Sequence, residues 1–166
     1  PPSLDKKQLA SWNALVIKGL AISGRVLERK DYIQSARNAL EFIENNQFDK
    51  NILMACYINK MSKFPAYLDD HAFLLDAILE FLQSEWDTKL LHFAIKLANT
   101  LIDNFLDEEK GGFFFTRNNH EKLIFRSKPM SDDAMPSGNG IACFTLQRLG
   151  FLVGDEKYLR ATKKTL

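Results

Sequence analysis

Two kinds of helical segment alternate along this chain, and this alternation constrains its fold more than any other feature. Apolar residues occupy nearly every helical face in residues 6–28, 68–82 and 136–153, as is typical of helices buried on most sides. Each is followed by a segment with a single apolar stripe, namely residues 31–46, residues 87–105 and the segment that begins at Asp155. We therefore expect three helical hairpins, each with an inner, buried helix and an outer, amphipathic one.

Residues with strong terminal preferences mark where some of these helices begin. Asp31 and Asp155 are expected to cap the amphipathic segments, because a carboxylate accepts hydrogen bonds from the free N–H groups of a first turn. Pro136 suits the first turn of the third inner helix, where its missing N–H would be unpaired anyway.

The hairpins repeat at a countable period. Aligning the amphipathic segments and counting back twenty residues brings Asn13, His71 and Asn139 to one repeat position, near the start of each buried helix. The period is therefore 58 and then 68 residues. The extra length carries two apolar runs, 113–115 and 123–125, which predict a β-hairpin between helix pairs. Residues 52–58 predict a strand in the first connection.

An inner and an outer helix per repeat is typical of an α/α toroid or a related solenoid. We predict an all-α chain that forms about half of an (α/α)₆ toroid, as one partial domain over residues 1–166 with short β-hairpins in the connections. A plain helical bundle is the alternative. Because an open array exposes the apolar sides of its end repeats, we also expect self-association through those ends, or helices that rearrange to cover them.

Composition excludes several classes of function. The chain has 22 basic and 21 acidic residues, a net charge of +1, so nucleic acid and anionic membranes are not expected partners. No apolar run is long enough for a membrane span, and no signal peptide precedes the first helix. Cys56 and Cys143 lie in apolar surroundings, which favours buried thiols and a cytoplasmic location. The chain starts Pro1-Pro2-Ser3 and stops within a helical pattern, so we expect a segment of a longer protein.

Polar residues interrupt the apolar surfaces where the inner helices begin. Capping is the simpler interpretation of Asp69, Ser137 and Asn139 taken singly, but it does not explain polarity at one repeat position three times. If the inner helices converge, an Asp-Asp-His cluster could supply a general acid or base. The candidate residues are Asp69, Asp70, His71 and Asp133 for catalysis, and Trp12, Asn13, Ser137 and Asn139 for ligand binding.

Other chemistries lack their sequence signals. The two cysteines form no C-x-x-C, and no spacing of His and Cys suits zinc. Neither a Walker nor a Rossmann glycine pattern occurs, so neither a metal nor a cofactor is expected.

Four ordered motifs resemble one known family. They are residues 5–7 with 12–15 (DKK and WNAL), 68–73 (LDDHAF), 111–114 (GGFF) and 133–139 (DAMPSGN). They are similar to the C-terminal region of the thioredoxin-domain-containing proteins related to spermatogenesis-associated protein 20. The resemblance implies a thioredoxin-like domain outside this chain, followed by a six-hairpin glycosidase-like toroid akin to N-acylglucosamine 2-epimerases. That family usually has Tyr at the position of His71 and Gly at that of Ala14, so it implies no catalytic histidine.

Two classes of function follow. The first is a carbohydrate-binding or carbohydrate-processing domain, a hydrolase or epimerase whose activity is expected of the longer protein. Asp69, Asp70 or Asp133 would be its acid or base, Asp70 with Asp133 the favoured pair, and Trp12 a stacking wall for a sugar. The second is a non-catalytic helical scaffold that binds a protein or a small ligand alongside a thioredoxin-like domain.

Overall fold

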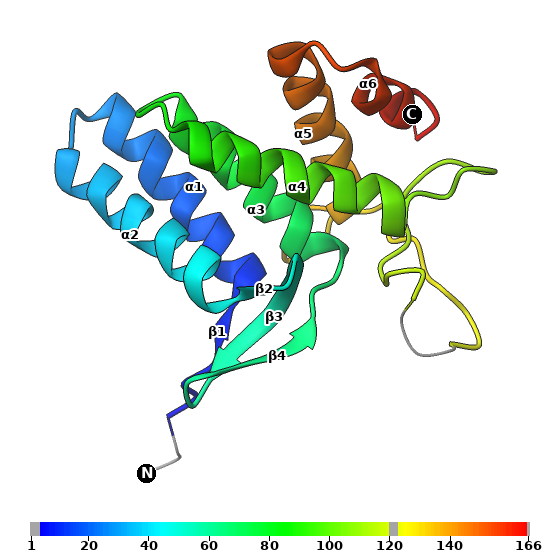
Figure 1. Cartoon of the computed structure of the whole chain (residues 1–166), viewed down its shortest axis with the longest axis horizontal. Helices are drawn as coiled ribbons and strands as arrows, with labels where there is room; N and C mark the ends of the chain where they lie inside the picture. Colours follow the sequence, from blue (N-terminus) through cyan, green and yellow to red (C-terminus); the bar gives the residue numbers. More distant parts are fainter. Residues whose placement is uncertain (1–3, 120–122, 166) are drawn as a thin grey trace.

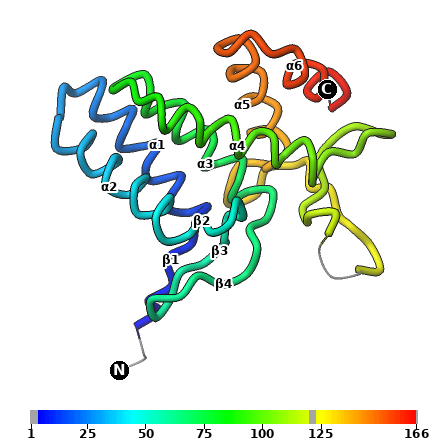
Figure 2. Tube along the Cα trace, viewed as in Figure 1, coloured from blue at the N-terminus to red at the C-terminus, as the bar shows by residue number. Residues whose placement is uncertain are grey.

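The described residues form six helices in three antiparallel pairs (Figures 1 and 2). The structure, a computed structural model, describes residues 4–119 and 123–165. The helices are α1 (Ala10–Val26), α2 (Lys30–Asn46), α3 (Leu68–Leu82), α4 (Thr88–Phe105), α5 (Gly138–Val153) and α6 (Glu156–Lys163). Helix α1 packs on α2, α3 on α4 and α5 on α6, so the predicted hairpins are confirmed.

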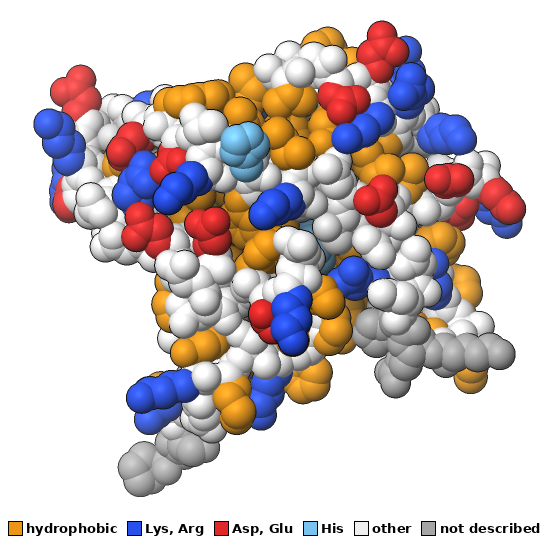
Figure 3. Space-filling model, viewed as in Figure 1, with side chains coloured by type: hydrophobic (Ala, Val, Ile, Leu, Met, Phe, Trp, Pro, Cys, Tyr) orange, Lys and Arg blue, Asp and Glu red, His pale blue; other side chains and the backbone are white. Residues whose placement is uncertain are grey.

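The inner helices stand in one row, with α3 between α1 and α5. Because α1 and α5 flank it and α4 packs against it, every residue of α3 except Asp69 is buried. Helices α2 and α4 bury only one stripe each, as their amphipathic patterns predict. The core therefore runs along the row. Apolar side chains reach the surface where α4 meets α5, while acidic and basic side chains are interspersed over the rest of that face (Figure 3).

A small antiparallel sheet fills the first connection between hairpins. Its strands are β1 (Gln8–Leu9), β2 (Phe48–Asp49), β3 (Ile52–Ile58) and β4 (Met61–Pro65), and β3 pairs with each of the others. Strand β3 confirms the prediction for residues 52–58. Asn59 and Lys60 join β3 to β4 with φ of 52° and 60°, the left-handed pair that a two-residue hairpin turn requires.

The β-hairpin predicted for 113–115 and 123–125 is absent from the part of the chain that the structure describes, which omits residues 120–122. Phe113 is buried and makes one isolated bridge, to Leu106. The backbone of this run pairs elsewhere: Phe113 with the Asn139 side chain, and Phe115 with Leu68 and Ser127. Few groups are therefore free for a regular ladder, and Ile124 and Phe125 are exposed.

Helix starts follow the predictions in part. Asp155 caps α6, and its carboxylate accepts from the Lys157 N–H at 3.0 Å. Asp31 instead lies in the first turn of α2, where the Arg29 guanidinium holds it. Pro136 precedes Ser137, the actual cap of α5, so its predicted first-turn position is wrong. Among the described residues, no helix is long and apolar enough to cross a membrane.

Candidate functional site

The first turns of α1, α3 and α5 meet at one end of the row. The Asp70 carboxylate of α3 accepts a hydrogen bond from the Ser11 N–H of α1 at 3.0 Å. On the other side, Gly138 of α5 lies against Asp69: a Cβ at Gly138 would fall 2.0 Å from Asp69 Oδ1. Glycine is therefore required for this approach, and the predicted convergence of the inner helices is present.

The Asp70 carboxylate links the first turns of α1 and α3. It is buried, and its second oxygen accepts from the Tyr67 N–H at 2.9 Å, which satisfies a free donor at the start of α3. Burial raises the pKa of Asp70, while the hydrogen bonds from Tyr67 and Ser11 oppose that rise. Both oxygens of this carboxylate are thus engaged by backbone of the protein.

The three residues at the shared repeat position hold backbone carbonyls. Asn13 donates to the Leu9 carbonyl at 2.8 Å, and His71 Nδ1 donates to the Tyr67 carbonyl at 2.8 Å. Asn139 donates to the Pro129 and Phe113 carbonyls, and its own oxygen accepts from the Phe113 N–H. At all three positions, the hydrogen bonds of the polar side chain therefore connect the inner helix to the segment that precedes it or packs against it.

His71 is neutral near pH 7. It is 1% exposed, and its ring packs against Phe105 with the centroids 5.1 Å apart. Burial lowers the pKa of His71 to about 4, because the charged imidazolium would lose its hydration. In this position the histidine acts as a buried donor to the Tyr67 carbonyl.

Asp69 differs from every other carboxylate of α3. Its Oδ1 is buried and has no hydrogen-bond partner among residues 4–119 and 123–165. Burial and then the nearby Asp70 carboxylate raise the pKa of Asp69 to about 6. A carboxyl with such a pKa exchanges its proton close to neutral pH, which is the property of a general acid or base.

Asp69 and Asp133 line the same pocket. The pocket has a volume of about 270 Å³, and its wall consists of Asp69, Phe115, residues of the loop before α5, including Asp133 and Ser137, and Gly138, the first residue of α5. Asp133 is exposed on this loop, and Ser137 caps α5 by accepting from the Gly140 N–H. Trp12 is 60% exposed and does not contribute to the lining, nor does Asp70.

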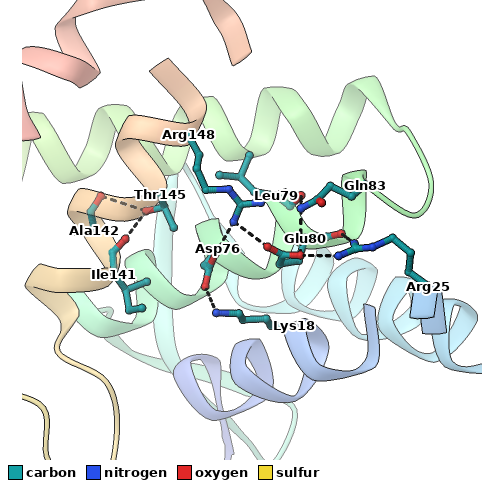
Figure 4. A network of polar contacts seen from close by, with 10 residues as sticks. All are labelled: Lys18, Arg25, Asp76, Leu79, Glu80, Gln83, Ile141, Ala142, Thr145 and Arg148. Carbon is teal, nitrogen blue, oxygen red and sulfur yellow. Dashed lines mark hydrogen bonds and ion pairs between the residues drawn. The ribbon is translucent and has the colours of Figure 1, made fainter. Parts of the chain in front are cut away.

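The other two acidic residues of α3 belong to an ion-pair network (Figure 4). Asp76 contacts Lys18 of α1 at 2.7 Å and Arg148 of α5 at 3.1 Å. Glu80 contacts Arg148 at 2.8 Å and Arg25 at 3.2 Å. Sequence reasoning missed this network because α3 was interpreted as apolar beyond its first turn. The signal was the four-residue spacing of Asp76 and Glu80, which puts both carboxylates on one helix face.

The architecture is that of a partial six-hairpin, (α/α)₆ glycosidase-like toroid. The cellobiose 2-epimerase of Spirochaeta thermophila matches with a TM-score of 0.74 over 95% of this chain and 42% of that one, at 14% identity. An inactive α-1,6-mannanase variant from a Salegentibacter species, with two adjacent aspartates changed to asparagine and α-1,6-mannotriose bound, matches with a TM-score of 0.68. This second match covers 95% of this chain and 45% of the mannanase, again at 14% identity. At such low identity, both structural similarities establish the fold alone.

Sequence comparison identifies a distant relative. The chain is homologous to human spermatogenesis-associated protein 20, with 30% identity over 169 residues and 95% of this chain. It spans about a fifth of the length of the curated relatives it matches, 22% of the human protein. No protein-family model matches the chain. The resemblance found in the sequence motifs is thereby confirmed.

Proposed function

We propose that the pocket between α3 and the loop before α5 binds a sugar, and that Asp69 is the acid or base of a hydrolase or epimerase reaction there. The observation that carries this proposal is the Asp69 carboxyl, with one buried oxygen that no group in the described residues compensates. Asp76 and Glu80 form ion pairs, and the Asp70 carboxylate accepts hydrogen bonds from two backbone N–H groups. Asp69 is therefore the one carboxyl group of α3 that remains available as an acid or base.

The lining gives each neighbouring group a role. Asp133 supplies a second carboxylate that is exposed to water, and two carboxyls in unlike environments suit division into acid and base. Phe115 offers an aromatic wall, and it already stacks on Tyr67 with ring centroids 5.0 Å apart. This pair, Asp69 with Asp133, replaces the pair of Asp70 and Asp133 favoured by sequence reasoning.

The two solved structures of similar fold support a sugar as the ligand. One is an epimerase of cellobiose and the other a mannanase, and the mannanase variant described as inactive has lost two adjacent aspartates. This chain has such adjacent pairs at Asp69-Asp70 and Asp132-Asp133. Because the chain covers less than half of each toroid, we assign turnover to the longer protein, in which further hairpins would complete the wall.

Binding is tested on this chain by amide NMR shifts, with α-1,6-mannotriose and cellobiose as probes. We expect one of them to shift the amides of Asp69, Phe115 and Gly138. Asp69→Ala should weaken that binding at least about tenfold, whereas the matched control Asp49→Ala, exposed on β2, should not. Shifts that map elsewhere, or that survive Asp69→Ala unchanged, contradict the site.

Turnover is tested on the longer protein. Asp69→Asn keeps the shape of the side chain and removes its titratable proton, so turnover should fall about 100-fold or more while probe binding changes little. Unchanged turnover would make Asp69 an architectural residue.

A non-catalytic scaffold is the second candidate. The observation in its favour is that Asp70, His71 and Asn139 direct their polar atoms at the protein's own backbone. This second candidate predicts that the longer protein binds the probe in the pocket but does not turn it over. Asp69→Asn would then have no activity to reduce.

A further inference from the structure

The pocket between α3 and the loop before α5 has a wall of one sign of charge. Asp69 and Asp133 are its charged residues, and the rest of the lining is apolar, small or hydroxyl-bearing. Within the part of the chain that the structure describes, neither Lys nor Arg contributes to this lining. The neighbouring Asp132 adds a carboxylate that accepts from the Ser137 N–H at 2.7 Å. The wall that this chain supplies is therefore negative.

Three cations on the segments around the pocket do not offset this charge. Lys128 contacts the Asp107 carboxylate at 2.7 Å, and Arg126 donates to the Thr116 carbonyl. Arg117 is 9% exposed and lies outside the lining. None of the three forms an ion pair with a carboxylate of the pocket.

The Asp69 carboxyl lacks both a donor and a compensating cation in the described residues. One of its oxygens is buried without a hydrogen-bond partner, yet the residue is partly exposed and lines the pocket, so a ligand can reach the carboxyl group. Burial and then the Asp70 carboxylate raise the pKa of Asp69 to about 6, and both disfavour its negative charge. At pH 7 the group is still mainly a carboxylate, which a cationic donor would stabilise.

We infer that the sugar bound in this pocket carries a free amino group, whose ammonium ion binds against Asp69 and Asp133. An ammonium group has three N–H donors and a positive charge, so it supplies both of the things that Asp69 lacks. A neutral sugar supplies hydroxyl donors without the charge, and an acidic or phosphorylated sugar adds negative charge to a negative wall. The inference rests on the proposed sugar site and concerns the part of the wall that this chain supplies.

A matched series of disaccharides tests the inference on this chain at pH 7. Cellobiose, the β-1,4-linked disaccharide of glucosamine (the diamine) and the N-acetylated form of the diamine differ only in the group at C2 of each ring. In amide NMR titrations, we expect the diamine to shift Asp69, Phe115 and Gly138 and to bind at least about tenfold more tightly than cellobiose. The acetylated form has no positive charge and should bind no more tightly than cellobiose.

Two further measurements isolate the charge. Asp133→Asn keeps the shape of the side chain and should reduce the preference for the diamine over cellobiose about threefold, whereas Asp49→Asn, the matched control on β2, should leave the preference unchanged. The bound diamine should also lower the pKa of Asp69 below about 6, because a nearby cation favours the carboxylate, and cellobiose should not.

The outcomes separate this inference from the proposed sugar site. Equal affinities for cellobiose and the diamine at these three amides overturn the inference and leave the sugar site standing. A preference that survives N-acetylation, or that maps to other amides, also overturns it. If no probe, α-1,6-mannotriose included, shifts these amides, the proposed sugar site fails and this inference fails with it.

Discussion

At the scale of single residues, the adjacent aspartates at the start of α3 have opposite relations to the fold. Asp70 receives two backbone N–H groups, one from α1 and one from its own turn, so its carboxylate stabilises the junction. Asp69 points toward Gly138, with a buried oxygen that finds no donor among the described residues. Asp70 therefore stabilises the fold, whereas Asp69 has a buried oxygen that destabilises it. A role in binding or catalysis would explain why such a residue is present.

Asp70→Asn should destabilise the chain. Asparagine has one acceptor oxygen, so its amide group would face the N–H of either Ser11 or Tyr67 and leave that buried donor unpaired. We expect the free energy of unfolding to fall by about 1–3 kcal/mol, as measured by urea denaturation. A change within error would mean that these hydrogen bonds contribute little in solution.

Asp69→Asn should leave the chain equally stable or more so at pH 7. The folded state holds the pKa of Asp69 at about 6, above its ordinary 3.8, so this group destabilises the fold progressively as the pH rises from about 4 to about 6. Because the side chain is partly exposed, solvent screening limits the gain from removing it to about 1 kcal/mol. Comparing wild type and Asp69→Asn by urea denaturation at pH 4 and pH 7 isolates the effect. A loss of stability at pH 7 would contradict it.

At the scale of elements, periodicity predicted the helices well and the connections poorly. Helix α3 runs from Leu68 to Leu82, and β3 from Ile52 to Ile58, as their patterns predicted. The β-hairpin predicted between α4 and α5 was wrong because the backbone partners of this segment, the Asn139 side chain among them, are distant in sequence. For the same reason the ion pairs of Asp76 with Lys18 and Arg148 could not be read from local pattern. Contacts between helices determine which of several polar residues at a helix start keeps a polar atom without a hydrogen-bond partner.

The approach of α5 to α3 makes a prediction for Gly138. Gly138→Ala would place its Cβ 2.0 Å from Asp69 Oδ1 and 3.1 Å from Leu68 Cγ, so α5 or Asp69 must move. We expect a loss of about 1–3 kcal/mol in thermal or chemical unfolding.

The matched control is the double variant Asp69→Ala with Gly138→Ala. It removes the atom that clashes and should recover part of that loss. Equal losses with and without Asp69 would show that the strain lies elsewhere.

At the scale of the whole molecule, three hairpins begin at one end, and the repeat makes that end the place where polar residues gather. The sequence predicted that the inner helices begin together at this end, and Asp69 and Asp133, which line the pocket there, were among its candidate residues. It could not distinguish Asp69 from Asp70, because adjacent residues on a helix point in different directions and only packing determines which becomes desolvated.

The central claim is that Asp69 is an uncompensated acid in the wall of a pocket, and its titration tests this most directly. The carboxyl carbons of the aspartates can be followed by NMR from pH 3 to pH 8 in the chain and in Asp69→Asn. We predict one aspartate with a pKa of about 6, whose signal is missing from the variant. Titration of Asp69 at or below its ordinary value of 3.8 would show a hydrated or paired carboxylate, and would contradict the account.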